Sequence, residues 1–153
     1  MNRVFIVLLL LFPLTGYCQN FIGKTRTRVI KELQHQVAKN DSLTITLTEN
    51  DSVVIYSIKG PAVLPADFIY GFDKSGKCRS EKVVAGCEAC FNKYLQNALD
   101  NKRYKWKKIN ENQYISTYAA RMMIELPPEN KDFSYTVLST EWTKELYTML
   151  KGN

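Results

Sequence analysis

The amino-acid sequence predicts an α+β domain: an antiparallel meander sheet of about seven strands, with about three helices on one face. Short β-branched or alternating runs follow one another with turns between them, which is the pattern of strands joined as hairpins. Three other segments carry apolar residues at the three-and-four spacing of a helix. The predicted order is helix, four strands, helix, three strands and helix. The two halves look like loosely similar helix-plus-meander units.

The first predicted element is a helix that begins after Thr25, within the opening segment over residues 21–40, and ends at Asn40-Asp41. Thr25 is the expected N-cap, because its hydroxyl can accept a hydrogen bond from a free amide of the first turn. His35 is the only histidine, and it lies opposite the apolar face, so we expect a solvated side chain rather than a general base. The apolar face holds Val29, Ile30, Leu33 and Val37.

Four strands are predicted after this helix. In the first of them threonine alternates strictly with apolar residues, so one face is expected to be buried and the other solvated. Gly76 lies in a predicted hairpin turn, where glycine adopts positive φ without strain. The strands are expected over residues 43–48, 52–58, 68–72 and 77–84.

The second half is predicted to begin with a helix over residues 87–101. A strand over 103–109, a long strand over 113–126 and a strand over 133–138 follow, and a short helix over 141–151 ends the chain. The buried face of the first of these helices is expected to hold Cys87, Phe91, Tyr94, Leu95, Ala98 and Leu99. One side of the last helix is expected to hold Trp142, Leu146, Met149 and Leu150.

The N-terminus has the layout of a secretory signal peptide. A polar start that contains Arg3 precedes an apolar run over residues 4–12, and Pro13 breaks the run. A membrane-spanning helix needs about 20 residues, so this run is too short to remain in a bilayer. We therefore expect export to the periplasm or beyond, with no transmembrane segment in the mature chain.

The expected cleavage site follows Cys18. Signal peptidase needs small side chains at the first and third positions before the cut, and Cys18 and Gly16 meet that need. The alternative is a lipoprotein anchored through Cys18, which we disfavour because Tyr17 is bulkier than the small residue that lipidation prefers before the cysteine. The predicted organisation is a signal peptide over residues 1–18 and one α+β domain over residues 19–153.

Composition favours a folded domain with a basic surface. The chain is 45% hydrophobic and carries a net charge of +6, of which the predicted leader removes one positive charge. An excess of positive charge attracts anionic partners, and the predicted export argues against nucleic acid as one of them. We expect a monomer that meets a protein or an anionic glycan or lipid surface, and we predict no cofactor.

Three cysteines remain after the predicted cut: Cys78, Cys87 and Cys90. Because an exported domain meets an oxidising environment, we expect one disulfide and one free thiol, with the pairing left open. The pair Cys87 and Cys90 lies at a predicted helix start, where a redox-active pair would also stand. A structural disulfide is the favoured interpretation, because the preceding strand is a hairpin arm and no βαβ unit is predicted. Three cysteines and one distant histidine are a poor set for zinc.

The densest basic segment interleaves cations with aromatic residues, a combination that can bind anionic polymers. The favoured alternative is a core strand with a solvated outer face, because lysine on sheet edges also suppresses aggregation. The candidate polyanion-binding residues are Lys102, Arg103, Lys105, Lys107 and Lys108.

Two short repeats place a serine after Asn-Asp, at Ser42 and Ser52. Each resembles a glycosylation acceptor and is predicted to stand where an exposed turn meets a strand. The favoured alternative is plain turn chemistry, because asparagine, aspartate and serine readily begin turns and strands.

Two segments resemble known groups of proteins. Gly23-Lys24-Thr25, followed by Val29 and Leu33, resembles the helix opening of small envelope proteins of the SmpA/OmlA and β-lactamase-inhibitor-like class. Residues 70–78, with the following helix and the Lys105-Trp106 segment, resemble uncharacterised small secreted or periplasmic bacterial proteins. These resemblances imply an α+β fold and a non-enzymatic envelope or inhibitory role.

No set of residues in the sequence has the spacing of a catalytic site, and no catalytic or metal-ligating residue is predicted. The sequence therefore favours a small exported binding or envelope-associated module. The alternative is a thiol–disulfide protein that uses Cys87 and Cys90.

Overall fold

The computed structural model describes residues 21–40, 44–50, 52–61, 63–129 and 131–152, and the predicted leader lies outside these ranges. In them the chain forms three helices and one eight-stranded antiparallel sheet, so the predicted α+β class is confirmed. The elements are α1 (Arg26–Ala38), β1 (Thr44–Glu49), β2 (Val53–Lys59), β3 (Ala66–Phe72), β4 (Cys78–Ala85), α2 (Glu88–Leu99), β5 (Lys107–Asn110), β6 (Gln113–Ile115), β7 (Met122–Glu125), β8 (Ser134–Ser139) and α3 (Lys144–Gly152).

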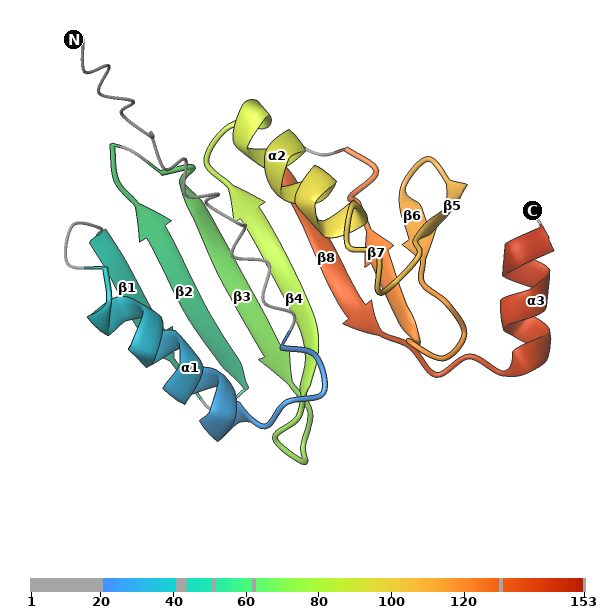
Figure 1. The fold of residues 1–153 in the computed structure, drawn as a ribbon, viewed down its shortest axis with the longest axis horizontal. Helices are drawn as coiled ribbons and strands as arrows, with labels where there is room; N and C mark the ends of the chain where they lie inside the picture. The colour runs from blue at the N-terminus through green and yellow to red at the C-terminus, as the bar shows by residue number, and fades with distance from the viewer. Residues whose placement is uncertain (1–20, 41–43, 51, 62, 130, 153) are drawn as a thin grey trace, which may run out of the picture.

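The sheet consists of two four-stranded meanders. Its strand order is β1-β2-β3-β4-β8-β7-β6-β5, so the two meanders join where β4 pairs with β8. Each meander follows a helix in the sequence, and α1 and α2 both lie in front of the sheet in Figure 1. α3 lies beyond the β5 edge. The helix-plus-meander organisation of the two halves is therefore present.

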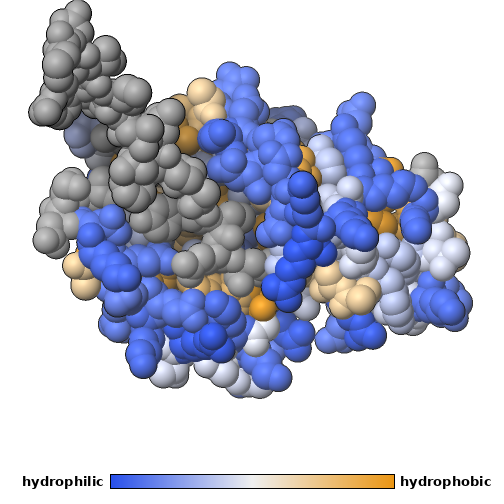
Figure 2. Space-filling model, viewed as in Figure 1, coloured by the Kyte–Doolittle hydropathy of each residue, from blue (hydrophilic) through white to orange (hydrophobic). Residues whose placement is uncertain are grey.

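The main core lies between the sheet and these two helices. Alternate residues of β2 and β3 are buried, as the period of two along a strand requires. Val29 and Leu33 of α1 and Phe91 and Ala98 of α2 cover them. Hydrophilic side chains dominate the outer surface of the helix-bearing side, which is the side seen in Figure 2.

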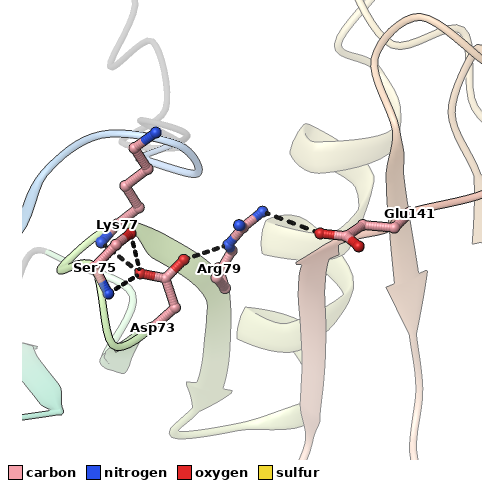
Figure 3. Close-up of polar contacts among 5 residues, drawn as sticks. All are labelled: Asp73, Ser75, Lys77, Arg79 and Glu141. Carbon is pink, nitrogen blue, oxygen red and sulfur yellow. Dashed lines mark hydrogen bonds and ion pairs between the residues drawn. The ribbon is translucent and has the colours of Figure 1, made fainter.

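The β3–β4 turn is held by one carboxylate. Asp73 accepts hydrogen bonds from the backbone N–H groups of Ser75 and Lys77 and from the Ser75 hydroxyl, and it pairs with Arg79 at 2.7 Å (Figure 3). These donors hold the pKa of Asp73 well below its usual value, the Ser75 hydroxyl and Arg79 first. Gly76 has φ +74°, as predicted for this turn. Arg79 also reaches Glu141 at 4.0 Å and so connects the turn to the segment after β8.

The segment before α1 adds to the sheet at the start of β4. The backbone N–H of Gly23 donates to the Cys78 carbonyl, and the Cys78 N–H donates to the Lys24 carbonyl. Thr25 is the N-cap residue of α1, but its hydroxyl makes no capping hydrogen bond, so that detail of the prediction was wrong. Its backbone instead forms a bridge to Lys77, which orients the residue toward the sheet.

The basic segment is mostly irregular, which corrects the predicted strand over residues 103–109. Strand β5 begins only at Lys107, because Lys105 has φ +47° and turns the chain. The core strand with a solvated outer face that the sequence favoured therefore does not extend over residues 103–106. The Trp106 indole donates to the Ala98 carbonyl at 3.0 Å, so this turn is tied to the end of α2.

The predicted long strand over residues 113–126 is a hairpin, and this raises the strand count to eight. Residues 116–121 form the turn between β6 and β7, where Arg121 has φ +52°. The Ser116 hydroxyl accepts the Met122 N–H at 2.9 Å inside the protein. A buried serine therefore closes a turn within a segment whose alternating apolar residues predicted one continuous strand.

The last helix is displaced from the predicted position by three residues at its start. Trp142 is buried just before α3, whereas Leu146 and Met149 are exposed, so the predicted apolar side does not pack as a unit. Tyr147 makes the inward contact instead. Its hydroxyl donates to the Ser116 carbonyl at 3.1 Å and its ring lies 5.5 Å from that of Tyr118.

Candidate functional site

The cations of the basic segment are exposed. Lys107 donates a hydrogen bond to the carbonyl of Lys151 in α3. Among the described residues none of the cations forms an ion pair with an acidic side chain. Their charges are therefore available to a partner. The exposed cations are Lys102, Arg103, Lys105, Lys107 and Lys108.

A groove of about 590 Å³ lies beside this segment. Its apolar lining includes Tyr104 and Met122, which are both largely buried. Three further segments complete it: the residues before α1, the β6–β7 turn and the end of β8. The lining residues are Ile22, Gly23, Lys24, Arg103, Tyr104, Thr117, Ala119, Ala120, Met122 and Ser139.

The groove has a positive rim. Arg103 and Lys24 are its two charged lining residues, and no acidic side chain is present in the lining. The Arg103 guanidinium lies 5.7 Å from the centre of the Tyr104 ring, which positions the cation over an aromatic floor. Lys24 also pairs with Glu32 at 3.0 Å, and this contact with Lys24, together with Arg28, lowers the pKa of Glu32.

Sequence reasoning found Arg103 but missed Lys24, Thr117 and Ser139. These residues come from segments that are far apart along the chain and meet only after the two halves join. Lys24 is in a motif that was used to predict a helix start, and nothing in its spacing pointed to Arg103.

A second groove, of about 680 Å³, lies at the β5–β6 turn. Lys82 shares its lining with Glu111 and Glu125, so cations and anions are mixed there. The Glu125 carboxylate already accepts a hydrogen bond from Gln113 at 3.1 Å. Because its charges have no common sign, this groove selects an anionic ligand less well than the one beside the basic segment.

The cysteine pairing that the sequence left open is Cys87 with Cys90. Their Cα atoms are 5.1 Å apart across the first turn of α2. Cys87 is the N-cap of that helix, and its sulfur accepts the Cys90 N–H at 3.1 Å. A disulfide that closes so short a loop stabilises a fold by about 2 kcal/mol in the chain-entropy model, against about 3 kcal/mol for a 15-residue loop. It joins no distant elements.

Cys78 is the free cysteine and is fully buried. Burial, with a smaller contribution from the nearby Glu81 charge, raises the pKa of its thiol to about 12. It begins β4, whereas Cys87 follows the end of that strand, and eight strand residues span about 25 Å. The two sites are therefore separate.

The other predicted positions are at the surface or outside the described residues. His35 is exposed on α1, as predicted. Ser52 is exposed in the β1–β2 turn, where Asn50 accepts the N–H groups of Ser52 and Val53 as turn chemistry requires. Ser42 lies outside the described residues.

The described helices include none that is long and apolar enough to cross a membrane. Within the described ranges, no three His, Cys, Asp or Glu side chains gather in a way that could hold a metal ion. Comparison with known proteins found no matching family model, curated protein or solved structure. The class of protein is therefore defined by its fold: an α+β domain with a helix-covered, eight-stranded antiparallel sheet.

Proposed function

We propose that the chain is an exported binding module, and that its ligand is an acidic polysaccharide seated in the groove beside the basic segment. One observation carries this proposal. Lys24 and Arg103, which are distant in the sequence, line the same groove and no acidic residue shares that lining. An envelope location is consistent with the resemblance of the Gly23-Lys24-Thr25 helix opening to small envelope proteins.

The extent of the basic segment favours a polymer over a small anion. Exposed cations continue from the groove, at Arg103, to the sheet edge, at Lys107 and Lys108. An extended chain of sulfate or carboxylate groups can contact both regions at once, and each contact adds a screened attraction. The Thr117 and Ser139 hydroxyls offer hydrogen bonds to sugar hydroxyls within the groove.

The test is the salt concentration that releases the protein from immobilised heparin, used as a probe of acidic polysaccharide. The double substitution Arg103→Gln and Lys105→Gln should lower this concentration clearly. The matched control, Lys31→Gln with Lys39→Gln, removes the same charge from exposed positions of the α1 region and should change it little. Equal shifts in both variants would show that heparin retention depends only on net charge. That result would refute the groove as the binding site.

A second measurement separates polysaccharide from membrane. Vesicles that contain anionic phospholipid are sedimented with the protein in the same salt range. Retention on heparin without sedimentation supports the proposed ligand. Sedimentation that depends on Arg103 and Lys105, without heparin retention, would replace it with a lipid surface.

A further inference from the structure

The Cys87 sulfur occupies a position that stabilises a thiolate. It is the N-cap of a 12-residue helix, where the helix dipole is positive and free backbone amides gather. The Cys90 N–H already donates to it at 3.1 Å. In the reduced protein the same amide would donate to the Cys87 thiolate, which lowers the pKa of a cysteine. Glu88, in the first turn, is the nearby charge that opposes this effect.

The two sulfurs differ in accessibility. Cys87 is partly exposed, whereas Cys90 is only 2% exposed and belongs to the core between helix and sheet. An incoming thiolate can therefore reach Cys87 and not Cys90. This difference in accessibility makes Cys87 the sulfur that is attacked and Cys90 the sulfur that leaves.

A loop is fixed against Gly86, the residue before Cys87, and against Tyr94 of α2. The Gly86 N–H donates to the Pro65 carbonyl at 2.8 Å, and the Tyr94 hydroxyl donates to the Leu64 carbonyl at 2.8 Å. Because Cys87 and Tyr94 are two helical turns apart on one side of α2, the loop runs along that side. Leu64 is 40% exposed in this loop, so it offers an apolar contact for a bound polypeptide on the same side of α2 as Cys87.

From these observations we propose that Cys87–Cys90 is a redox-active disulfide that oxidises pairs of thiols in extended polypeptides. This activity is independent of the anionic groove. A staple across one helical turn stabilises a fold less than one that closes a long loop, whereas an exchange site needs one accessible sulfur at a position that stabilises the thiolate.

The exchange proceeds in two steps. A substrate thiolate attacks the Cys87 sulfur, the Cys87–Cys90 bond breaks, and Cys90 leaves as a thiolate that takes a proton from solvent. The second substrate thiolate then attacks the substrate sulfur of the mixed disulfide and releases Cys87 as a thiolate. Two electrons pass from the substrate dithiol to the cystine. A small-molecule disulfide, such as oxidised glutathione, accepts those electrons and restores the Cys87–Cys90 bond.

The first experiment uses the full chain carrying Cys18→Ser, so that only the three described cysteines contribute. The protein is equilibrated in glutathione buffers, and the fraction of reduced Cys87–Cys90 is counted by alkylation and intact mass. We expect the bond to open within the range of glutathione buffers. We also expect Cys87 in the reduced protein to ionise well below the ordinary thiol pKa of about 8.5. A bond that excess reduced glutathione leaves closed would overturn the proposal.

A trapping experiment identifies the attacking sulfur. With Cys90→Ser added, oxidised glutathione should form one mixed disulfide at Cys87, because no resolving thiol remains. The matched variant, Cys87→Ser, leaves the buried Cys78 and Cys90 and should form none while it stays folded by circular dichroism. Equal adduct formation in both variants would overturn the assignment.

Stability gives a readout that needs no cysteine variant at the site. Because the Cys87 thiolate stabilises the reduced form, reduction should lower the denaturant midpoint by less than the opening of so short a loop alone predicts. A fall as large as that loop-opening loss, or larger, would identify the disulfide as a structural staple.

Discussion

The carboxyl group of Glu81 accepts a hydrogen bond from the backbone N–H of Phe21 inside the core. Glu81 is 2% exposed and stands on β4 opposite Tyr70 of β3 and Val137 of β8. Burial raises the pKa of Glu81 to about 8, against the smaller lowering effect of the Phe21 hydrogen bond. The segment before α1 is therefore joined to the centre of the sheet by a carboxyl group that is mostly neutral at pH 7.

The stability of the protein should fall as pH rises from about 4.5 to 8. Over that range the folded state keeps the Glu81 proton that the unfolded chain, with an ordinary pKa of 4.5, releases. The free energy of unfolding should decrease by roughly 3–5 kcal/mol from this group. The substitution Glu81→Gln should remove the decrease, since glutamine retains an acceptor for Phe21 without a charge. Urea unfolding of both proteins at pH 5 and pH 8.5 measures this decrease in the free energy of unfolding.

The comparison has an internal control. Well below pH 4.5 the wild-type carboxyl is protonated in both states, so its contribution to the difference between wild type and Glu81→Gln should be constant there. Parallel unfolding free energies of the two proteins from pH 5 to pH 8.5 would show that Glu81 titrates normally.

Gly86 is predicted to tolerate no side chain. A Cβ at this position would stand 2.8 Å from Cγ of Pro65, closer than carbon atoms pack. Gly86→Ala should therefore destabilise the protein by about 1–3 kcal/mol, because the proline ring and the backbone must move apart. The measurement is the urea midpoint, with Gly152→Ala as control, since nothing stands within 4 Å of that position. A midpoint for Gly86→Ala equal to that of wild type would contradict the contact.

Strand prediction succeeded where one face is buried and the turns are short. In the first meander the alternation of apolar and polar residues and the turn glycine Gly76 located all four strands to within two residues. It failed in the second meander because local backbone features override the pattern. Lys105 and Arg121 adopt positive φ, which no residue-type preference signals for these side chains. Ser116 is polar yet fully buried, so its place in a turn was hidden in an apolar run.

The candidate site was predictable only in part. Local sequence pointed to the basic segment and to the cysteines, because charge density and short spacing are visible along the chain. The groove depends on contacts between residues near position 24 and residues beyond position 100, which sequence spacing does not encode. The choice of Cys87 with Cys90 could have been drawn from the predicted strand over residues 77–84, whose length already separates Cys78 from them.

Cys78 should be unreactive in the folded protein. It is fully buried and its thiol pKa is raised to about 12, so the thiolate is scarce up to strongly alkaline pH. In a chain with Cys18→Ser and the disulfide intact, iodoacetamide should add no label under native conditions and one label in denaturant, as intact mass would show. The variant that also carries Cys78→Ala should take none in either case. Native labelling of Cys78 would mean that the core opens around β4.

The Cys18→Ser substitution distinguishes the two predicted forms of export. Serine is also small, so cleavage after position 18 should continue and the exported protein should still begin at Gln19. A lipoprotein needs the Cys18 sulfur as the acylation site, so the same substitution would abolish processing and membrane attachment. Intact mass and fractionation of cells that express each form measure both outcomes. A charged residue within the leader, Leu9→Arg, should block export in either case because it interrupts the apolar run. Export that survives Leu9→Arg would contradict the assignment of residues 1–18 as a leader.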